Sequence, residues 1–199
     1  MITAFWAAAL LAAVPPGLEF EAWFTQRGVS VEIARRPGPI PWVRGTGELP
    51  VPAEKVEAVI SDFAGYRKLM APAVEKAVVI EAGERTARLH MVWDYPFPLR
   101  DRDAVVRYRG ERLEEGGFRL IWRDEARPGD PSGGVRIEKV AGETRVDPLG
   151  PGRCRVTYTY LGDLGGSFPR SVEEKAWRHE PLGYFYALRR ALGLPQPSR

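Results

Sequence analysis

Between residues 74 and 161, apolar and polar side chains alternate, and short glycine-containing turns interrupt the alternation. A period of two places successive side chains on opposite faces of a strand. Strands joined by such short turns pair in antiparallel fashion. The sequence therefore predicts one antiparallel sheet, with turns at Gly83 and Gly142 among others. The expected strands are 74–82, 85–95, 103–113, 118–125, 135–140, 144–149 and 153–161.

Two further kinds of element precede this run. Residues 19–35 read as one or two strands, and residues 43–51 are again extended. Pro52 then opens a helix, since proline is tolerated in the first turn. Val56, Val59, Ile60 and Phe63 share one helical face. With a further turn at residues 66–70, this predicts a short helical pair near residues 53–70.

The last element is a long amphipathic helix that ends near Leu192. Ser171 and Glu174 have the spacing of a capping box at its start. Pro181 lies inside the helix and should kink it, because proline leaves the carbonyl of Trp177 without a partner. A curved sheet around this helix buries both apolar faces. The predicted class is α+β, a helix-grip fold.

Strict alternation assigns one face of each strand to the interior. The expected lining of an internal cavity, including one face of the last helix, is Leu89, Met91, Trp93, Tyr95, Val106, Tyr108, Phe118, Leu120, Trp122, Val156, Tyr158, Tyr160, Trp177, Tyr184 and Leu188. The arginines of the opposite face are expected in water: Arg88, Arg107, Arg119, Arg123, Arg136 and Arg155. Tyrosine and tryptophan carry polar groups that need partners in a packed core. This composition favours a small-molecule cavity over a filled core.

Catalytic and metal chemistry find little support in the sequence. His90 is expected to point outward and His179 to lie on the last helix, so neither suggests a metal site. The acidic residues Asp94, Asp101 and Asp103 interleave with two arginines and are read as exposed ion pairs. The inward tyrosines are the only expected acid–base candidates, and their usual pKa near 10 makes them poor bases. No enzyme activity, cofactor or metal is expected.

Bulk composition excludes other classes. The chain has 199 residues and a net charge of +3, without a concentrated basic run, so no nucleic-acid partner is expected. The lone Cys154 excludes an internal disulfide and is expected to be buried. Residues 1–17 form a signal-like apolar segment, which predicts export to the periplasm or the cell exterior, or a cytoplasmic protein if it is no signal. Residues 18–193 are expected to form the domain and 194–199 a disordered tail.

Three features together resemble START lipid-transfer domains of the bacterial type, within the helix-grip (SRPBCC, Bet v 1-like) superfamily. They are the proline-rich corner at 93–103 that runs into the Arg-Asp repeat at 100–103, the segment Gly165 to Pro169 before the last helix, and Pro181 inside that helix. The resemblance covers residues 19–192. The loop at 128–134 is short for the family, which leaves the size of the ligand open.

The resemblance implies a cavity between sheet and last helix that holds one lipid or sterol-like molecule, for carriage or transfer. It implies no cofactor, and we expect a monomer with transient membrane contact. Three alternatives stay open: a cyclase- or aromatase-like enzyme for a polyketide or aromatic compound, a chaperone for a quinone-like molecule, and an interaction module with a filled core.

Overall fold

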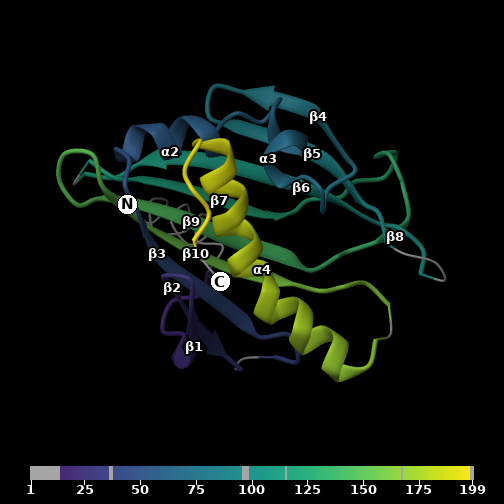
Figure 1. Cartoon of the computed structure of the whole chain (residues 1–199). Coiled ribbons are helices and arrows are strands. Elements are labelled where there is room, and N and C mark those ends of the chain that lie inside the picture. Colours follow the sequence, from purple (N-terminus) through teal and green to yellow (C-terminus); the bar gives the residue numbers. More distant parts are fainter. Residues whose placement is uncertain (1–13, 36–37, 96–98, 115, 167, 198–199) are drawn as a thin grey trace, which may run out of the picture.

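A curved antiparallel sheet closes over one face of a long helix, as Figure 1 shows for this computed structural model. The structure describes residues 14–35, 38–95, 99–114, 116–166 and 168–197. Its strands are β1 Glu21–Gln26, β2 Val29–Ala34, β3 Trp42–Leu49, β4 Lys76–Gly83, β5 Thr86–Trp93, β6 Arg102–Arg112, β7 Phe118–Asp124, β8 Val135–Arg136, β9 Val140–Pro148 and β10 Cys154–Gly162. Its helices are α2 Ala53–Ile60, α3 Tyr66–Met70 and α4 Arg170–Ala191.

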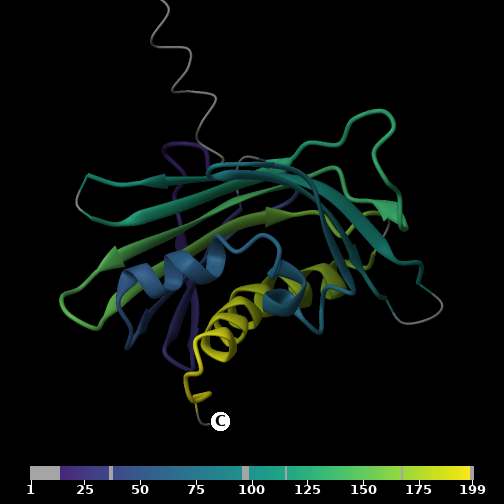
Figure 2. The same cartoon turned by 90° about the horizontal axis from the view of Figure 1, so that it is seen from above.

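The order of the strands across the sheet is β1-β2-β3-β10-β9-β7-β6-β5-β4. Neighbours in this order pair in antiparallel fashion, and the short β8 pairs parallel with the start of β6. The segment with α2 and α3 links β3 to β4, and all three helices lie on the concave side of the sheet (Figure 2). The α+β helix-grip fold expected from the sequence is confirmed.

The concave face and the helices enclose the main core. Leu120 on β7, Val156 on β10 and Leu188 on α4 are almost inaccessible to solvent and belong to this core. Cys154 is buried with a free thiol, as expected. The alternation in the sequence thus assigned the inward face of the strands correctly.

Gly142 lies inside β9, where the sequence predicted a turn, so that prediction is wrong. A Cβ atom at this position would lie 2.4 Å from the Trp122 ring and 2.4 Å from the carbonyl oxygen of Thr159. The glycine therefore makes room for the indole against the strand. The expected strand at 135–140 is also shortened to β8, and Val140 already begins β9.

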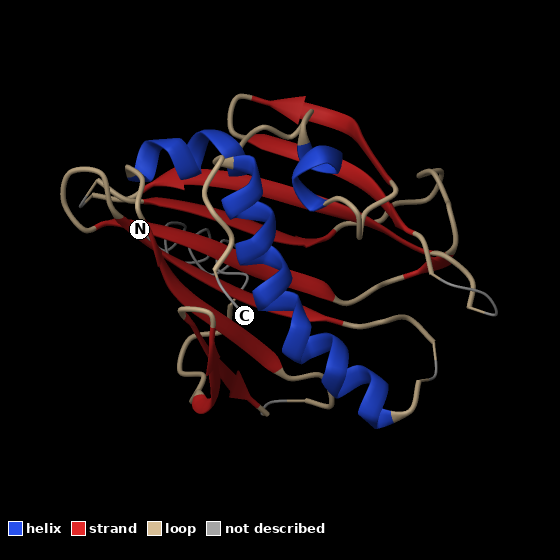
Figure 3. Ribbon diagram, in the orientation of Figure 1, coloured by secondary structure: helices blue, strands red, loops and turns tan. Residues whose placement is uncertain are grey.

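Helix α4 begins at Arg170, with Pro169 as its N-cap and no side-chain capping bond. The predicted capping box is wrong, because Ser171 is already inside the first turn and is exposed. The prediction for Pro181 is confirmed, since the helix changes direction near its middle (Figure 3). Pro181 has no backbone N–H to donate to the carbonyl oxygen of Trp177. The hydroxyl group of Tyr160 donates a hydrogen bond of 3.0 Å to this oxygen instead.

The outer face of β5 and β6 is covered, contrary to the expectation for Arg88 and His90. Arg88 is only 3% exposed and pairs with Glu81 and with Asp130. The loop between β7 and β8 (residues 125–134, the β7–β8 loop) folds back across these strands and brings Asp130 to Arg88. Arg123 and Arg155 are exposed as expected, whereas Arg107, Arg119 and Arg136 are only partly exposed.

His90 forms a second buried group on the outer face. Its Nε2 atom lies 2.9 Å from Oδ2 of Asp103, and Arg136 of β8 lies 2.8 Å from the same oxygen. Asp103 is fully buried, so the reading of Asp103 as an exposed partner of its neighbouring arginines is wrong. The return of the chain at β8, parallel to β6, places Arg136 directly opposite Asp103.

Both ends of the chain extend beyond these elements. The first 13 residues of the signal-like segment lie outside the described residues. Among the residues that are described, no helix is both long and apolar enough to cross a membrane. Near the other end, Arg189 donates to the carbonyl oxygen of Pro195, and the Gln196 side chain donates to that of Tyr186.

Candidate ligand-binding site

The structure brings the predicted lining residues together on the concave face and the facing side of α4. Two of them, Trp93 and Tyr95, are partly buried, and the others are buried members of the main core. Their role in binding a ligand stays a prediction. Pro96, Phe97 and Pro98 of the proline-rich corner lie outside the described residues.

Five aromatic side chains form a continuous wall, which we call the aromatic wall: Tyr108, Trp122, Tyr158, Tyr160 and Tyr184. Tyr158 of β10 is its centre, since its ring stacks on Tyr184 of α4 with centroids 4.0 Å apart. The indole of Trp122 also stacks with the Tyr158 ring, with centroids 5.4 Å apart. The wall thus joins the middle of the sheet to the helix by ring-on-ring contact, a geometry that adds to the burial of the rings.

The hydroxyl groups of the aromatic wall find partners within the protein. Tyr184 shares a 2.8 Å hydrogen bond with Oγ1 of Thr144 on β9. Tyr160 donates to the carbonyl of Trp177, and the indole N–H of Trp177 donates to the carbonyl of Gly162 at 3.1 Å. These polar tips are therefore satisfied without a ligand, and their presence alone does not require one.

In the part of the chain that the structure describes, Glu180 on α4 is the carboxyl group that accepts a hydrogen bond from this wall. Its Oε1 atom accepts a hydrogen bond of 3.0 Å from the hydroxyl group of Tyr158. The sequence reading missed it by treating the tyrosines as the only inward acid–base groups. Helical spacing carried the signal, because Glu180 follows Trp177 by three residues and precedes Tyr184 by four, which places it on the apolar face.

Burial governs the protonation of these groups. Desolvation raises the pKa of Tyr108, Tyr158, Tyr160 and Tyr184 above the ordinary value. The phenols therefore stay neutral at physiological pH and act as hydrogen-bond donors, not as bases. Desolvation also raises the pKa of Glu180, although the hydrogen bond from Tyr158 opposes this shift. The wall thus combines neutral donors with one carboxyl group.

Arg102 connects the β5–β6 corner to the start of α4. Its guanidinium donates to the carbonyl oxygens of Leu164 and Gly165, each at 3.0 Å. The same group lies 5.0 Å from the ring of Tyr95 and 4.9 Å from that of Phe168. Arg102 is buried, so the expected surface ion pair is replaced by a clamp between two loops at one end of the sheet–helix interface.

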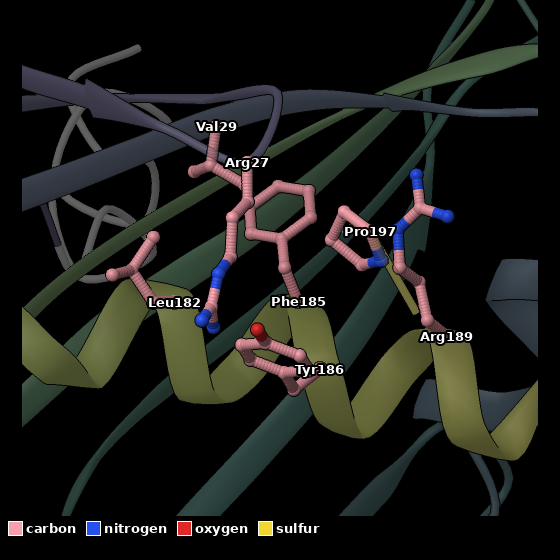
Figure 4. A pocket seen from close by; sticks show the side chains of 7 residues that line it. All are labelled: Arg27, Val29, Leu182, Phe185, Tyr186, Arg189 and Pro197. Atoms are coloured by element: carbon pink, nitrogen blue, oxygen red, sulfur yellow. The ribbon is translucent and has the colours of Figure 1, made fainter. Parts of the chain in front are cut away.

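A small pocket lies apart from the aromatic wall, between the β1–β2 hairpin and the C-terminal half of α4 (Figure 4). Arg27 and Arg189 stand on two sides of it, and Phe185 forms part of its floor. Arg27 also lies 5.0 Å from the ring of Tyr186. None of the predicted lining residues contributes to this pocket.

The remaining candidates from the sequence are separated from the wall. His179 is exposed on α4, where the sequence placed it. Within the described part of the chain, no group of three or more His, Cys, Asp or Glu residues is arranged to hold a metal ion.

Comparisons with known proteins agree with this architecture. Residues 42–180 match the model of a family described as polyketide cyclase/dehydrase and lipid transport. An uncharacterized protein of Pseudomonas aeruginosa is 27% identical over 149 residues, which are 74% of this chain and 73% of that protein.

Solved structures share the fold. The STAR-related lipid transfer protein of Xanthomonas axonopodis superposes with a TM-score of 0.74 at 24% identity, over 87% of this chain and 98% of that one. Human StAR-related lipid transfer protein 5 superposes with a TM-score of 0.77 at 17% identity, over 94% and 92%. The START helix-grip fold is thereby established. Since the family model spans more than half of the chain, this protein belongs to the polyketide cyclase/dehydrase and lipid transport family.

Proposed function

We propose that this protein binds one lipid or other apolar small molecule between the concave face of the sheet and α4, and carries it. The observation that supports this most directly is the aromatic wall, which lines the sheet–helix interface from β6 to α4. Apolar burial of a ligand there contributes about 25 cal/mol per Å² before the costs of ordering are subtracted. The family description, which includes lipid transport, points the same way.

Entry of a ligand requires α4 to move away from the sheet. Side chains outside the apolar core hold the helix at both ends. Arg102 clamps the loop that precedes it, and Arg190 near its C-terminus donates to the carbonyl oxygen of Leu69 on α3 at 2.7 Å. The proline-induced bend between these ends divides α4 into two segments, so one half can open while the other stays in place.

Native mass spectrometry of the gently purified full-length chain tests this proposal. A stoichiometric apolar passenger, identified after extraction, is the expected result, and a near-ultraviolet chromophore would identify a quinone-like ligand. A bare protein that also fails to bind a panel of fluorescent lipids would contradict the proposal and favour a filled core.

Trp122→Arg should abolish lipid uptake, because a charge replaces the buried indole in the aromatic wall. Val78→Arg is the matched control, since Val78 is 41% exposed on β4 of the same sheet. Circular dichroism establishes whether each variant is folded. Unchanged lipid binding by folded Trp122→Arg protein would remove this residue from the site.

An enzyme of the cyclase type is the second candidate, and the pairing of Glu180 with Tyr158 favours it. A carboxyl group with a raised pKa beside a neutral phenol can transfer a proton to or from a bound aromatic compound. Turnover of a polyketide-like substrate that disappears in Tyr158→Phe would support this reading. Binding without turnover would favour the carrier.

The carrier is further proposed to be an exported monomer that touches membranes transiently. The apolar segment at residues 1–17 supports export. Two exposed apolar side chains, Leu99 beside the β5–β6 corner and Val172 in the first turn of α4, support membrane contact near the Arg102 clamp. N-terminal sequencing of the mature protein, size-exclusion chromatography and flotation with liposomes test these three statements separately.

A further inference from the structure

Glu180 occupies an unusual place for a carboxyl group. Protein atoms surround it closely enough for desolvation to raise its pKa, yet its side chain is only half-buried. Its partial exposure leaves the carboxyl group accessible to a small molecule, and the hydrogen bond from Tyr158 places it beside the aromatic wall. Its position on α4, between Trp177 and Tyr184, directs it toward the sheet and the aromatic wall.

The groups around Glu180 are phenols from several elements. The negative charge of Glu180 contributes to the raised pKa values of Tyr158 and Tyr160 of β10, Tyr184 of α4, Tyr66 of α3, Tyr108 of β6 and Tyr95 after β5. Among the described residues, no lysine, arginine or histidine forms an ion pair with Glu180 within 4.0 Å. The nearest cation along the helix, Arg178, lies over the ring of Phe24 at 4.3 Å.

A carboxylate in such surroundings is incompletely compensated. The neutral hydroxyl group of Tyr158 donates one hydrogen bond to Oε1, which offsets part of the lost hydration. The second oxygen, Oε2, can accept a hydrogen bond from a further partner. The partner that restores most of the lost hydration energy is a hydrogen-bond donor, and a cationic donor does so most strongly. A ligand carboxylate within hydrogen-bond distance of Glu180 is disfavoured, because two negative charges repel strongly where water is excluded.

We infer that Glu180 and Tyr158 form the polar end of the ligand site and select apolar molecules that end in a hydrogen-bond donor, a hydroxyl or a protonated amine, over molecules that end in a carboxylate. This inference rests on the proposed function. Glu180 accepts from the ligand head group through Oε2, while Tyr158 fixes the carboxyl group through Oε1. The apolar body of the ligand then lies along the aromatic wall.

The test compares head groups on identical chains. The full-length protein is titrated at pH 8 with decyl and hexadecyl alcohols, decyl and hexadecyl amines, decanoate and palmitate. Intrinsic tryptophan fluorescence follows binding, and native mass spectrometry gives the stoichiometry. The expected result is that, at one chain length, the alcohol and the amine bind at least tenfold more tightly than the carboxylate.

Glu180→Gln removes the charge but keeps an acceptor for Tyr158. It should strengthen carboxylate binding at least tenfold, weaken amine binding by a similar factor and change alcohol binding less than threefold. Glu174→Gln is the matched control on the same helix, because Glu174 is solvent-accessible and pairs with Arg170. It should leave all affinities unchanged.

Two outcomes overturn the inference, and they differ in their meaning. If the three head groups bind wild-type protein within threefold of one another, Glu180 does not select ligands, and the proposed function stands. If none of the six compounds binds, the inference and the proposed function both fail. The ranking on the wild-type protein needs no variant, so a Glu180→Gln protein that fails to fold leaves the test intact.

Discussion

Removal of the Asp103 carboxylate should destabilise the protein strongly. Asp103 is fully buried beneath β8 and the β7–β8 loop, and its Oδ2 atom is shared by His90 and Arg136. Asp103→Ala deprives both partners of their acceptor in a place that water reaches poorly. The perturbation therefore tests whether the covered outer face is a second structural centre of the fold.

The expected cost follows from the burial of the two partners. Loss of one member of a buried pair costs about 3–5 kcal/mol when the partner stays uncompensated. The buried His90 loses its hydrogen-bond partner, which costs about 1–3 kcal/mol, whereas the charged Arg136 side chain is 22% exposed and can recover some hydration. The lower end of the range, about 3 kcal/mol, is therefore expected. For a chain of this size it corresponds to a fall in Tm of about 6–12 °C.

Urea unfolding of wild-type protein and variant, with an unchanged m value, measures this difference. Asp147→Ala is the control, because Asp147 pairs with Arg145 on the exposed side of β9 and should cost less than about 1 kcal/mol. Asp103→Asn should fall between the two, since it keeps the shape and one acceptor oxygen. A loss below about 1 kcal/mol in Asp103→Ala would refute the reasoning and show that water replaces the carboxylate.

Three further predictions concern the concave side, and each is checked by urea unfolding. Gly142→Ala should cost about 1–3 kcal/mol through overpacking against the indole, whereas Gly183→Ala, in open space on α4, should be neutral or stabilising. Tyr160→Phe should cost about 1–2 kcal/mol, because it leaves the buried carbonyl of Trp177 without a donor. The cost should be smaller in a Pro181→Ala background, where the backbone N–H of residue 181 can donate to this carbonyl, and equal costs in the two backgrounds would contradict this. Burial raises the pKa of Glu180 in the folded state above its unfolded value of 4.5. The folded state therefore binds this proton more tightly than the unfolded state does. As a result, the free energy of unfolding falls as the pH rises from 4.5 through the raised pKa. The stability gained by Glu180→Gln should therefore be absent near about pH 4 and grow toward about pH 8, and a gain that does not change with pH would contradict it.

The sequence was sufficient for the elements and for the inward face. Alternation is a local property, and one buried face fixes which side chains point inward, so Leu120, Trp122 and Tyr158 could be assigned to the core directly. The same holds for Pro181, whose missing N–H predicts both a bend in α4 and a free carbonyl at Trp177. Glu180 was also within reach of the sequence, because its helical spacing, more than its polarity, decides where it points.

Contacts between distant segments were beyond any local pattern. That Tyr160 would supply the donor for Trp177 depends on the packing of β10 against α4. The glycine at 142 resembles a turn residue in sequence, and only the position of the Trp122 ring on the neighbouring strand explains it. In the same way, Arg102 reads as a surface charge until the loop before α4 brings its carbonyl groups within reach.

The sequence by itself determined an antiparallel sheet, a long C-terminal helix and the apolar face between them, because hydrophobic period and proline act within a few residues. Only the tertiary structure decided which residues of the outer face are buried. The β7–β8 loop folds back over β5 and β6, which turns Arg88, His90 and Asp103 from expected surface residues into buried ones. The physical reason is that burial of a polar side chain depends on which distant segment covers it and supplies its partners, and no periodicity along the chain records that.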